Sequence, residues 1–357
     1  NFENRKMKDL QTKKKAYLLV LPASGHINPV TGIVTELVKK NVHVVMYSNE
    51  EYKPLIEKTG AEFRRFAVRI HPDYLYEFDF RKNVNTVSKL LIDMAKSSQV
   101  LVHNLIQDTE LDRTDLIMYD TVSTFGFYLM KMIENRFNKK ISSYKPPKFI
   151  RISQTFSIKI NVFPNKEERN ILKTNRNIWV FYYIFKLFFI EIFFCWRNGL
   201  SYNSSLKSLI IKDPNLIEIT TIIPEFQPRA ELFDDTYRFV GSCVNENVRS
   251  IEISDEKLKN ILQDFKPQNP LKNKNDLDKH KLVYLSLGSV FNNNPEVFNK
   301  FILAFKQLKS EPDFKNKLKF VVSAGRAFDK VINDDQDICI LRWSPQIELL
   351  KRASLFI

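Results

Sequence analysis

His26 and Asp120 have the residue types and chain positions of a general base and its supporting carboxylate. His26 follows the apolar run "AYLLVLP", and Asp120 ends the apolar run "DLIMYD". A carboxylate hydrogen-bonded to an imidazole fixes its tautomer and raises its basicity, so the histidine can take a proton from a hydroxyl near neutral pH. From sequence spacing alone, the alternative is a capping aspartate and an unrelated histidine in a turn.

A second set of residues has the chemistry of a nucleotide site. In "SLGS", Gly288 allows close backbone approach to a ligand, and Ser289 offers a hydroxyl and an N–H to a phosphate. In "RWSPQ", an exposed Trp343 would stack on a flat base while Gln346 hydrogen-bonds the edge of that base. The alternatives are an ordinary turn for the first motif and a core tryptophan for the second.

These residues need strands that end at a common edge. Residues 16–47 read as strand, helix and strand, with Asn28 as the helix N-cap, Pro29 at its first position and an apolar face from Val30 to Val38. The alternation continues and restarts after residue 281, which predicts doubly wound parallel α/β sheets. Ligands of such sheets bind beyond the carboxyl ends of the strands.

The chain divides, by this pattern, into two domains and their connections. We expect a disordered basic N-terminus at 1–15, then a first Rossmann-like domain at 16–245 with a helical aromatic insertion at about 160–215. A polar linker at 246–281 leads to a partial second domain at 282–357. The sequence stops inside a predicted strand, "SLFI", so the second domain is expected to be incomplete.

Charge and cysteine usage narrow the class of protein. The net charge is +14, but the basic residues are scattered among acidic ones, which predicts a solvated surface and no nucleic-acid partner. Cys195, Cys243 and Cys339 stand far apart, which is typical neither of a disulfide framework nor of a metal or redox motif. Because the N-terminal residues also lack a secretory apolar region, a cytoplasmic location is expected.

One apolar stretch at 178–196 has about the length of a membrane span, but it contains Lys186 and Glu191 on different sides of a helix. A largely buried helix or the wall of an apolar cavity is the favoured interpretation, with loose membrane association as an alternative. Two Asp-x-Asp pairs have the spacing of metal-dependent sugar transferases, but neither follows an apolar strand, so both are read as loops: Asp276 with Asp278, and Asp335 with Asp337.

Five stretches together resemble the inverting UDP-dependent glycosyltransferases of family 1, and most closely their macrolide-glycosyltransferase branch. The resemblance runs from about Lys15 to Ile357 and is specific as a set. The stretches are "LPASGHINPVTGIVTELVKKNVHVVMYS", "DLIMYDTVSTFG", "FQPRAELFDDTYRFVGS", "VYLSLGSVFN" and "LRWSPQIELLKRASLFI".

The resemblance implies a GT-B fold, in which an acceptor domain and a nucleotide-sugar domain face a cleft. It makes His26 the catalytic base and Asp120 its support in a reaction that inverts the anomeric carbon as UDP leaves. It further implies a UDP-sugar co-substrate and no cofactor or metal, because helix N-termini and side chains stabilise the departing diphosphate. The aromatic insertion corresponds to the variable acceptor side of the family, which favours a small lipophilic acceptor.

The same resemblance assigns the donor-binding residues. Trp343 is expected to stack on uracil, Ser344 and Gln346 to lie at the uridine, and Gly288 with Ser289 to lie near the diphosphate. The family's Thr-His-Gly-Gly-x-Asn-Ser stretch, which holds the phosphates, and its later acidic-Gln pair, which holds the sugar, do not occur in this sequence. A chain without them is expected to transfer little or no sugar.

Three other interpretations are kept beside the leading one. A non-catalytic, lipophile-binding remnant of a glycosyltransferase is the main alternative, and an authentic stop codon after Ile357 would favour it. A sugar-nucleotide epimerase of the same architecture would act without an acceptor, but the match of "FQPRAELFDDTYRFVGS" disfavours it. A nucleic-acid binder is indicated only by the net charge and should lose affinity steeply with salt.

Overall fold

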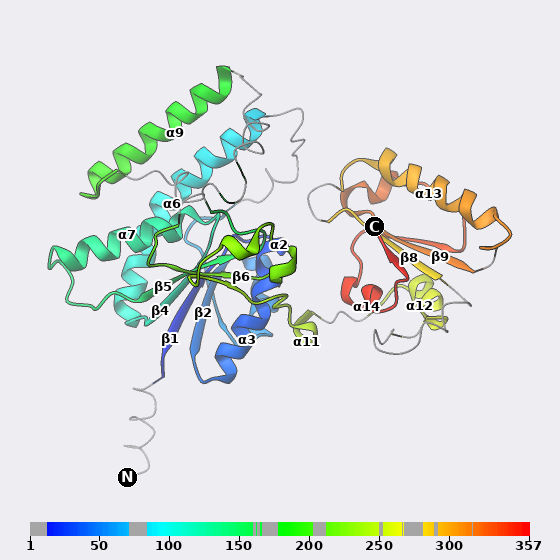
Figure 1. Ribbon diagram of the computed structural model, residues 1–357, viewed down its shortest axis with the longest axis horizontal. Helices are drawn as coiled ribbons and strands as arrows, with labels where there is room; N and C mark the ends of the chain where they lie inside the picture. Colours follow the sequence, from blue (N-terminus) through cyan, green and yellow to red (C-terminus); the bar gives the residue numbers. More distant parts are fainter. Residues whose placement is uncertain are drawn as a thin grey trace, which may run out of the picture. The chain divides into compact units, whose positions relative to one another are not determined.

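The structure is a computed structural model, and it forms two compact units (Figure 1), the first ending at Val248 and the second beginning at Arg249. It describes residues 13–70, 84–159, 162, 165, 178–202, 212–249, 253–265, 267, 281–288, 292–315 and 317–357. Most of the N-terminal segment predicted to be disordered lies outside these residues. The prediction is one residue too long, because Lys15 already begins the first strand.

The first unit contains a seven-stranded sheet in which all neighbouring strands run parallel. Its strand order is β3-β2-β1-β4-β5-β6-β7, so the order reverses between β1 and β4, as in doubly wound folds. The strands are β1 (Lys15–Leu19), β2 (His43–Ser48), β3 (Glu62–Arg65), β4 (Leu116–Asp120), β5 (Lys148–Ser153), β6 (Ile217–Thr220) and β7 (Tyr237–Phe239).

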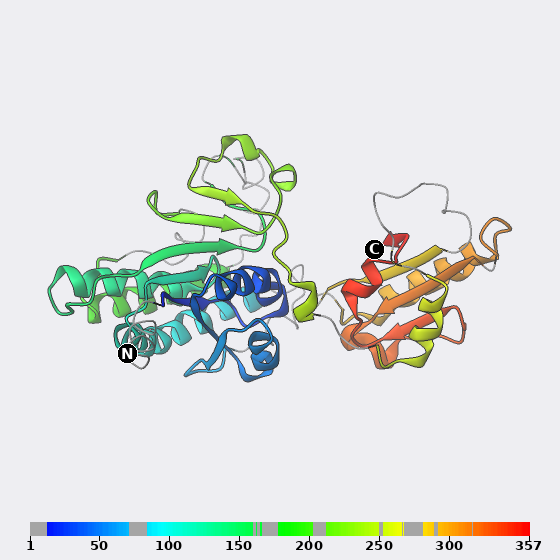
Figure 2. The same ribbon diagram turned by 90° about the horizontal axis from the view of Figure 1, so that it is seen from below.

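Helices lie on both faces of this sheet (Figures 1 and 2). The α-helices of the first unit are α2 (Ser24–Ile27), α3 (Thr31–Lys39), α4 (Lys53–Glu57), α6 (Val84–Asp112), α7 (Thr124–Asn138), α9 (Ile178–Arg197) and α11 (Glu246–Arg249), which ends at the unit boundary. Short 3-10 helices are η1 (Asn28–Val30), η2 (Glu50–Tyr52), η3 (Pro224–Phe226) and η4 (Ala230–Leu232).

The strand residues alternate between the two faces, as the period of a β-strand requires. On one face, Leu18, Met46 and Met118 form a buried apolar cluster with two valines. Val30 directly precedes α3, and Val34 lies on it. On the other face, tyrosine side chains of neighbouring strands reach the long helix α6. The Tyr17 hydroxyl donates to the Asp108 carbonyl oxygen at 3.0 Å, and the Tyr47 hydroxyl donates to the Asp108 carboxylate at 2.7 Å.

The predicted first helix is present, but its predicted cap is wrong. The chain turns directly after β1 into α2 and η1, so Asn28 has helical backbone angles (φ −57°, ψ −45°) and its side chain caps nothing. Pro29 does lie at the start of a helix, the 3-10 helix η1. An Asn-Pro pair is compatible with a helix N-terminus, but the preceding "SGHI" already forms a helical turn, which the sequence pattern did not indicate.

The last segment of the first unit returns to α3. The N–H of Gly32 donates to the carbonyl oxygen of Cys243 at 2.6 Å, and a Cβ on Gly32 would lie 2.4 Å from that oxygen. Asn245 adds two hydrogen bonds, from its N–H to Thr31 Oγ1 at 2.9 Å and from its side chain to Thr35 Oγ1 at 3.0 Å. A glycine is required at position 32 because the two backbones are in contact.

The second unit has a four-stranded parallel sheet of order β10-β9-β8-β11, with helices on both faces. Its elements are α12 (Glu256–Gln263), β8 (Lys281–Ser286), α13 (Pro295–Ser310), β9 (Leu318–Ser323), η6 (Gly325–Lys330), β10 (Ile338–Leu341), α14 (Gln346–Leu350) and β11 (Leu355–Phe356). Asn294 caps α13: its side chain accepts a hydrogen bond from the N–H of Glu296.

The linker predicted at 246–281 is too long. Within it, α12 buries Leu258, Ile261 and Leu262 against the same sheet face that contacts Leu349 of α14. Asp255 caps this helix by accepting from the N–H of Leu258 at 2.8 Å. The run of charges hid the helix because its apolar residues form one narrow face, and both prolines of the predicted linker, Pro267 and Pro270, follow it. Residues 266 and 268–280 of the predicted linker lie outside the described residues.

The predicted aromatic insertion contains α9, which packs along α6 (Figure 1). Within the described residues, no helix is long and apolar enough to cross a membrane. Of the two charged residues in this stretch, Glu191 is buried at 2% exposure, whereas Lys186 is exposed. The remaining parts of the insertion at 166–177 and 203–211 lie outside the described residues.

Candidate functional site

His26 and Asp120 meet at the carboxyl edge of the first sheet. His26 lies on the one-turn helix α2 directly after β1, and Asp120 is the last residue of β4, which pairs in parallel with β1. The His26 Nδ1 atom is 2.5 Å from Asp120 Oδ2. Two residues that are remote in the chain thus form one hydrogen-bonded pair, because adjacent parallel strands end at the same edge.

Asp120 is held firmly in place. Its side chain is 1% exposed, whereas the His26 ring is 24% exposed. The N–H of Leu21 donates to Asp120 Oδ2 at 3.3 Å, and the N–H of Val122 donates to Oδ1 at 3.0 Å. The carboxylate therefore has backbone donors on both oxygens in addition to the imidazole. A fixed acceptor at Nδ1 places the proton of the neutral ring on that atom and leaves Nε2 as the basic nitrogen.

The environment of His26 raises its pKa. Burial alone would lower the pKa of the imidazole, but the charge of Asp120 and the hydrogen bond to it outweigh burial and raise the pKa above its ordinary value. The ring is consequently more basic than a free histidine. This is the direction required of a group that must attract the proton of a hydroxyl.

Gln154 is a third polar residue at this edge, and the sequence analysis missed it. It follows β5, whose Ile152 is paired with Asp120, and a hydrogen bond of its side chain also raises the pKa of His26. Its Nε2 atom is buried and has no hydrogen-bond partner among the described residues. The only available signal was its position just after an apolar strand, a property that many surface residues share.

Gly288 lies in the turn after β8 at the carboxyl edge of the second sheet. Its φ of 71° is in the left-handed region that favours glycine, and no described residue lies within 4 Å of the position of a Cβ. The side chain of Asn292, which is 1% exposed, donates to the Gly288 carbonyl oxygen at 2.8 Å and so fixes the turn. Ser289, the other predicted phosphate-binding residue, lies outside the described residues.

The residues predicted to contact the base follow β10 at the same edge. Trp343 is 61% exposed, so the alternative interpretation as a core tryptophan is wrong. Ser344 Oγ lies 2.7 Å from the Tyr284 hydroxyl of β8, which ties this loop to a neighbouring part of the sheet. Gln346 begins α14, and its N–H donates to the Ser344 carbonyl oxygen at 2.8 Å. An exposed indole is thus presented on a hydrogen-bonded loop.

No cluster of three or more histidine, cysteine or acidic side chains suitable for a metal ion occurs in the described part of the chain. Of the two Asp-x-Asp pairs, Asp276 and Asp278 lie outside the described residues. In the other pair, the carboxylates of Asp335 and Asp337 both accept from Lys309. Asp337 also forms an ion pair with Lys319, so lysine side chains neutralise both carboxylates.

Known proteins similar to this chain are glycosyltransferases. It is 25% identical over 345 residues to the NDP-glycosyltransferase YjiC of Bacillus licheniformis, covering 94% of this chain and 72% of the relative. It is 24% identical over 348 residues to an uncharacterized UDP-glucosyltransferase, YojK, of Bacillus subtilis, covering 95% of this chain and 73% of the relative. No family profile matches the chain.

Solved structures of glycosyltransferases share the fold. The glycotransferase of kitacinnamycin superposes with a TM-score of 0.64 at 16% identity, over 96% of this chain and 75% of the other. The calicheamicin glycosyltransferase CalG4 superposes with a TM-score of 0.62 at 16% identity, over 97% of this chain and 74% of the other. Together these likenesses confirm the predicted GT-B fold, the resemblance to UDP-dependent glycosyltransferases and the transferase class.

Proposed function

We propose that this protein transfers a sugar from a UDP-sugar to a hydroxyl of a small lipophilic acceptor, with inversion at the anomeric carbon. The observation that carries the proposal is the His26–Asp120 pair at the end of two adjacent parallel strands. The names of the similar proteins, NDP-glycosyltransferase and UDP-glucosyltransferase, support a nucleotide-sugar donor. The proposal requires no cofactor or metal ion.

His26 acts as the general base in this reaction. Its Nε2 removes the proton of the acceptor hydroxyl while the hydroxyl oxygen attacks the anomeric carbon. The bond from that carbon to the diphosphate oxygen breaks on the opposite side, and UDP leaves with the bonding electron pair. Asp120 holds the ring through Nδ1 and stabilises the imidazolium that forms, without itself taking the proton. Gln154 is positioned to orient the same ring.

The donor residues of the proposal are on the second sheet. The exposed indole of Trp343 stacks on uracil, and Ser344 and Gln346 lie beside the uridine. Gly288, with its left-handed backbone, allows a diphosphate to approach the main chain closely, and Ser289 adds a hydroxyl donor. Stacking and backbone contacts recognise the nucleotide part, which is common to donors with different sugars.

Replacement of the base tests this proposal directly. Protein expressed from its complete coding sequence is incubated with UDP-glucose and a panel of phenols and sterols, and acceptor-dependent release of UDP is measured. The change His26→Ala should lower kcat by about 100-fold or more, because positioned general bases contribute about 10² to 10⁴-fold. The affinity for UDP-glucose, measured without an acceptor, should stay unchanged, because His26 belongs to the first unit and the proposed donor residues belong to the second.

His43 provides the matched control. It begins β2, at the amino end of the strand next to β1, and its Nε2 lies 2.9 Å from a Glu62 carboxylate oxygen. A His43→Ala variant also loses a histidine–carboxylate pair of the same sheet, but it should retain full transfer. Full activity in the His26→Ala variant would exclude His26 as the base, and UDP-glucose binding without any UDP release would favour a non-catalytic remnant.

A further inference from the structure

A row of aromatic side chains covers the outer side of α9. Five residues with spacings of three and four define this row, here called the aromatic stripe. Each is at least half exposed: Tyr182 (52%), Phe185 (63%), Phe189 (52%), Phe193 (55%) and Trp196 (76%). At about 100° per residue, the stripe occupies roughly 80° of the helix surface. Isolated exposed apolar residues are common, but five in line on one helix form a contiguous surface.

On the opposite side of α9, described side chains pack against α6 and α7. Leu187 packs into a cluster with Ile92 and Ala95 of α6, and Phe194 stacks edge-on against Tyr128 of α7 with ring centroids 5.0 Å apart. A glutamine of α6, Gln99, also donates to a backbone carbonyl of α9 at 3.2 Å. The helix is therefore fixed by its inner face, and the aromatic stripe is not needed for its packing.

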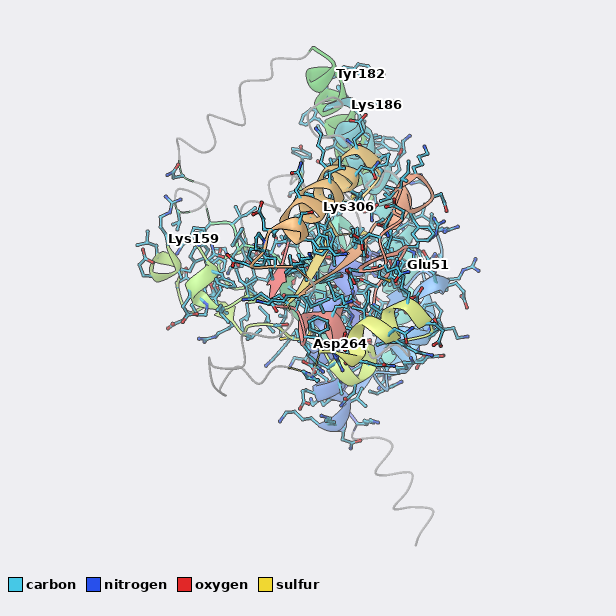
Figure 3. All side chains as sticks on the ribbon, turned by 90° about the vertical axis from the view of Figure 1, so that its right-hand side faces the viewer. Glu51, Lys159, Tyr182, Lys186, Asp264 and Lys306 are labelled. Carbon is cyan, nitrogen blue, oxygen red and sulfur yellow. The ribbon has the colours of Figure 1, made fainter. Side chains whose placement is uncertain are left out.

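The charges of α9 favour an anionic partner. Lys186 and Arg197 are exposed and lie about 40° and 60° around the helix from Tyr182, along one edge of the stripe. The acidic residue of the helix, Glu191, lies on the buried face at 2% exposure. Figure 3 shows Tyr182 and Lys186 projecting from the same part of α9. The whole chain carries a net charge of +14, which adds a long-range attraction of the same sign.

We propose that the aromatic stripe docks on the surface of a membrane that contains anionic lipids, with α9 lying in the plane of the interface. Tryptophan, tyrosine and phenylalanine are the residues that interfacial helices insert at headgroup level, while lysine and arginine bind the lipid phosphates. A second copy of the chain fits less well, because both copies would bring basic edges together. The helix does not cross the bilayer, so binding is peripheral and reversible.

Vesicle sedimentation tests the docking surface independently of sugar transfer. The protein is mixed with vesicles of phosphatidylcholine alone or with phosphatidylserine, and the bound fraction is measured over a range of lipid concentrations. Binding should require phosphatidylserine and should weaken as salt increases. The triple change Phe185→Ser, Phe189→Ser and Trp196→Ser should lower the partition coefficient by about 100-fold, because it removes three aromatic side chains that would be buried in the membrane interface.

Two further variants make the result specific. Replacing Lys186 and Arg197 by glutamine should lower binding by about tenfold and reduce its salt dependence. Replacing Phe226 and Ile332 by serine, which are 69% and 80% exposed elsewhere, should leave binding unchanged. Equal binding by the triple variant and the parent would overturn the proposal. So would a dimer in sedimentation velocity that the triple change dissociates, since that would make a second copy the partner.

Discussion

The two candidate sites are built in opposite ways. At the edge of the first sheet, Asp120 is almost completely buried, and backbone N–H groups and His26 occupy its oxygens. At the edge of the second sheet, Trp343 is largely exposed, and no described residue would contact a Cβ added to Gly288. The Asp120 side chain of the first site is buried and hydrogen-bonded within the protein, whereas the Trp343 side chain of the second site is exposed.

This difference separates two kinds of residue. A side chain that is buried and hydrogen-bonded in the unliganded protein contributes both to folding and to the reaction, so its loss affects both. An exposed residue contributes almost nothing to folding, and its loss is felt only when the ligand binds. The contrast leads to predictions of decreasing size.

The largest effect is expected from Asp120→Ala. The change removes the partner of His26, so kcat should fall by about 10² to 10⁴-fold. It also removes the acceptor of the buried Leu21 N–H and of the partly buried Val122 N–H, which should lower the free energy of unfolding by about 1–3 kcal/mol for the buried group and by less for the other. Enzyme assays and urea unfolding measure the two losses.

Asp115 is the matched control for that variant. It lies just before the same strand, at its amino end, and its carboxylate accepts from the backbone N–H of Lys15 at 2.9 Å. An Asp115→Ala variant should lose some stability but retain the parent kcat. If both variants lost activity equally, the loss would reflect damage to the sheet and not the removal of a catalytic group.

A smaller effect is expected on the pH dependence. Because the pKa of His26 is raised, kcat/KM should rise with pH through a value above the ordinary 6.5 of histidine, as the ring loses its proton. Changing Asp120 to Asn removes the charge that raises this pKa, so the inflection should move to lower pH. An inflection that stays in place would show that another group controls the profile.

The same pair should also make stability depend on pH. A histidine whose folded pKa is raised contributes stability that is fully present below its unfolded pKa of about 6.5. This contribution is lost as the pH rises through the folded value. The parent should therefore lose part of its stability on the alkaline side of the inflection seen in kcat/KM, and the Asp120→Asn variant should not.

The smallest change in folding, with a clear change in binding, is expected from Trp343→Ala. Loss of base stacking should raise KM for the UDP-sugar by about tenfold, in keeping with about 1–3 kcal/mol per stacked base. Thermal unfolding should be unaffected because the indole is 61% exposed. Ile332→Ala, at a position of the same unit that is 80% exposed, should change neither quantity. A large loss of stability in Trp343→Ala would contradict the contrast between the two sites.

The sequence predicted these two sites to different extents. Apolar runs that end at His26 and Asp120 were enough to place both residues at one sheet edge, because parallel strands impose that edge whatever lies between them. Their direct pairing was expected only from the family resemblance, which makes Asp120 the support of His26, because local patterns do not give the strand order. For Trp343, the pattern allowed a buried or an exposed ring equally, since exposure depends on tertiary packing.

Other features left no readable signal in the sequence. Gln154 and Asn292 act through single hydrogen bonds whose partners are determined by tertiary structure. The one-turn helix α2 displaced the expected cap at Asn28, because a short helical turn has no apolar periodicity of its own. The helix α12 was hidden by its surrounding charges. Regular elements are thus predictable from repetition, whereas isolated contacts are not.

The contact between Gly32 and Cys243 determines where the polypeptide departs from the first unit. The chain is tethered to the helix that follows His26 just before it continues toward Arg249. This attachment is a hydrogen bond between main-chain atoms of Gly32 and Cys243. A longer connection beyond Val248 would leave this hydrogen bond intact. A bulkier residue at position 32 would instead clash with the Cys243 backbone, break the hydrogen bond and disturb the helical turn that carries the imidazole.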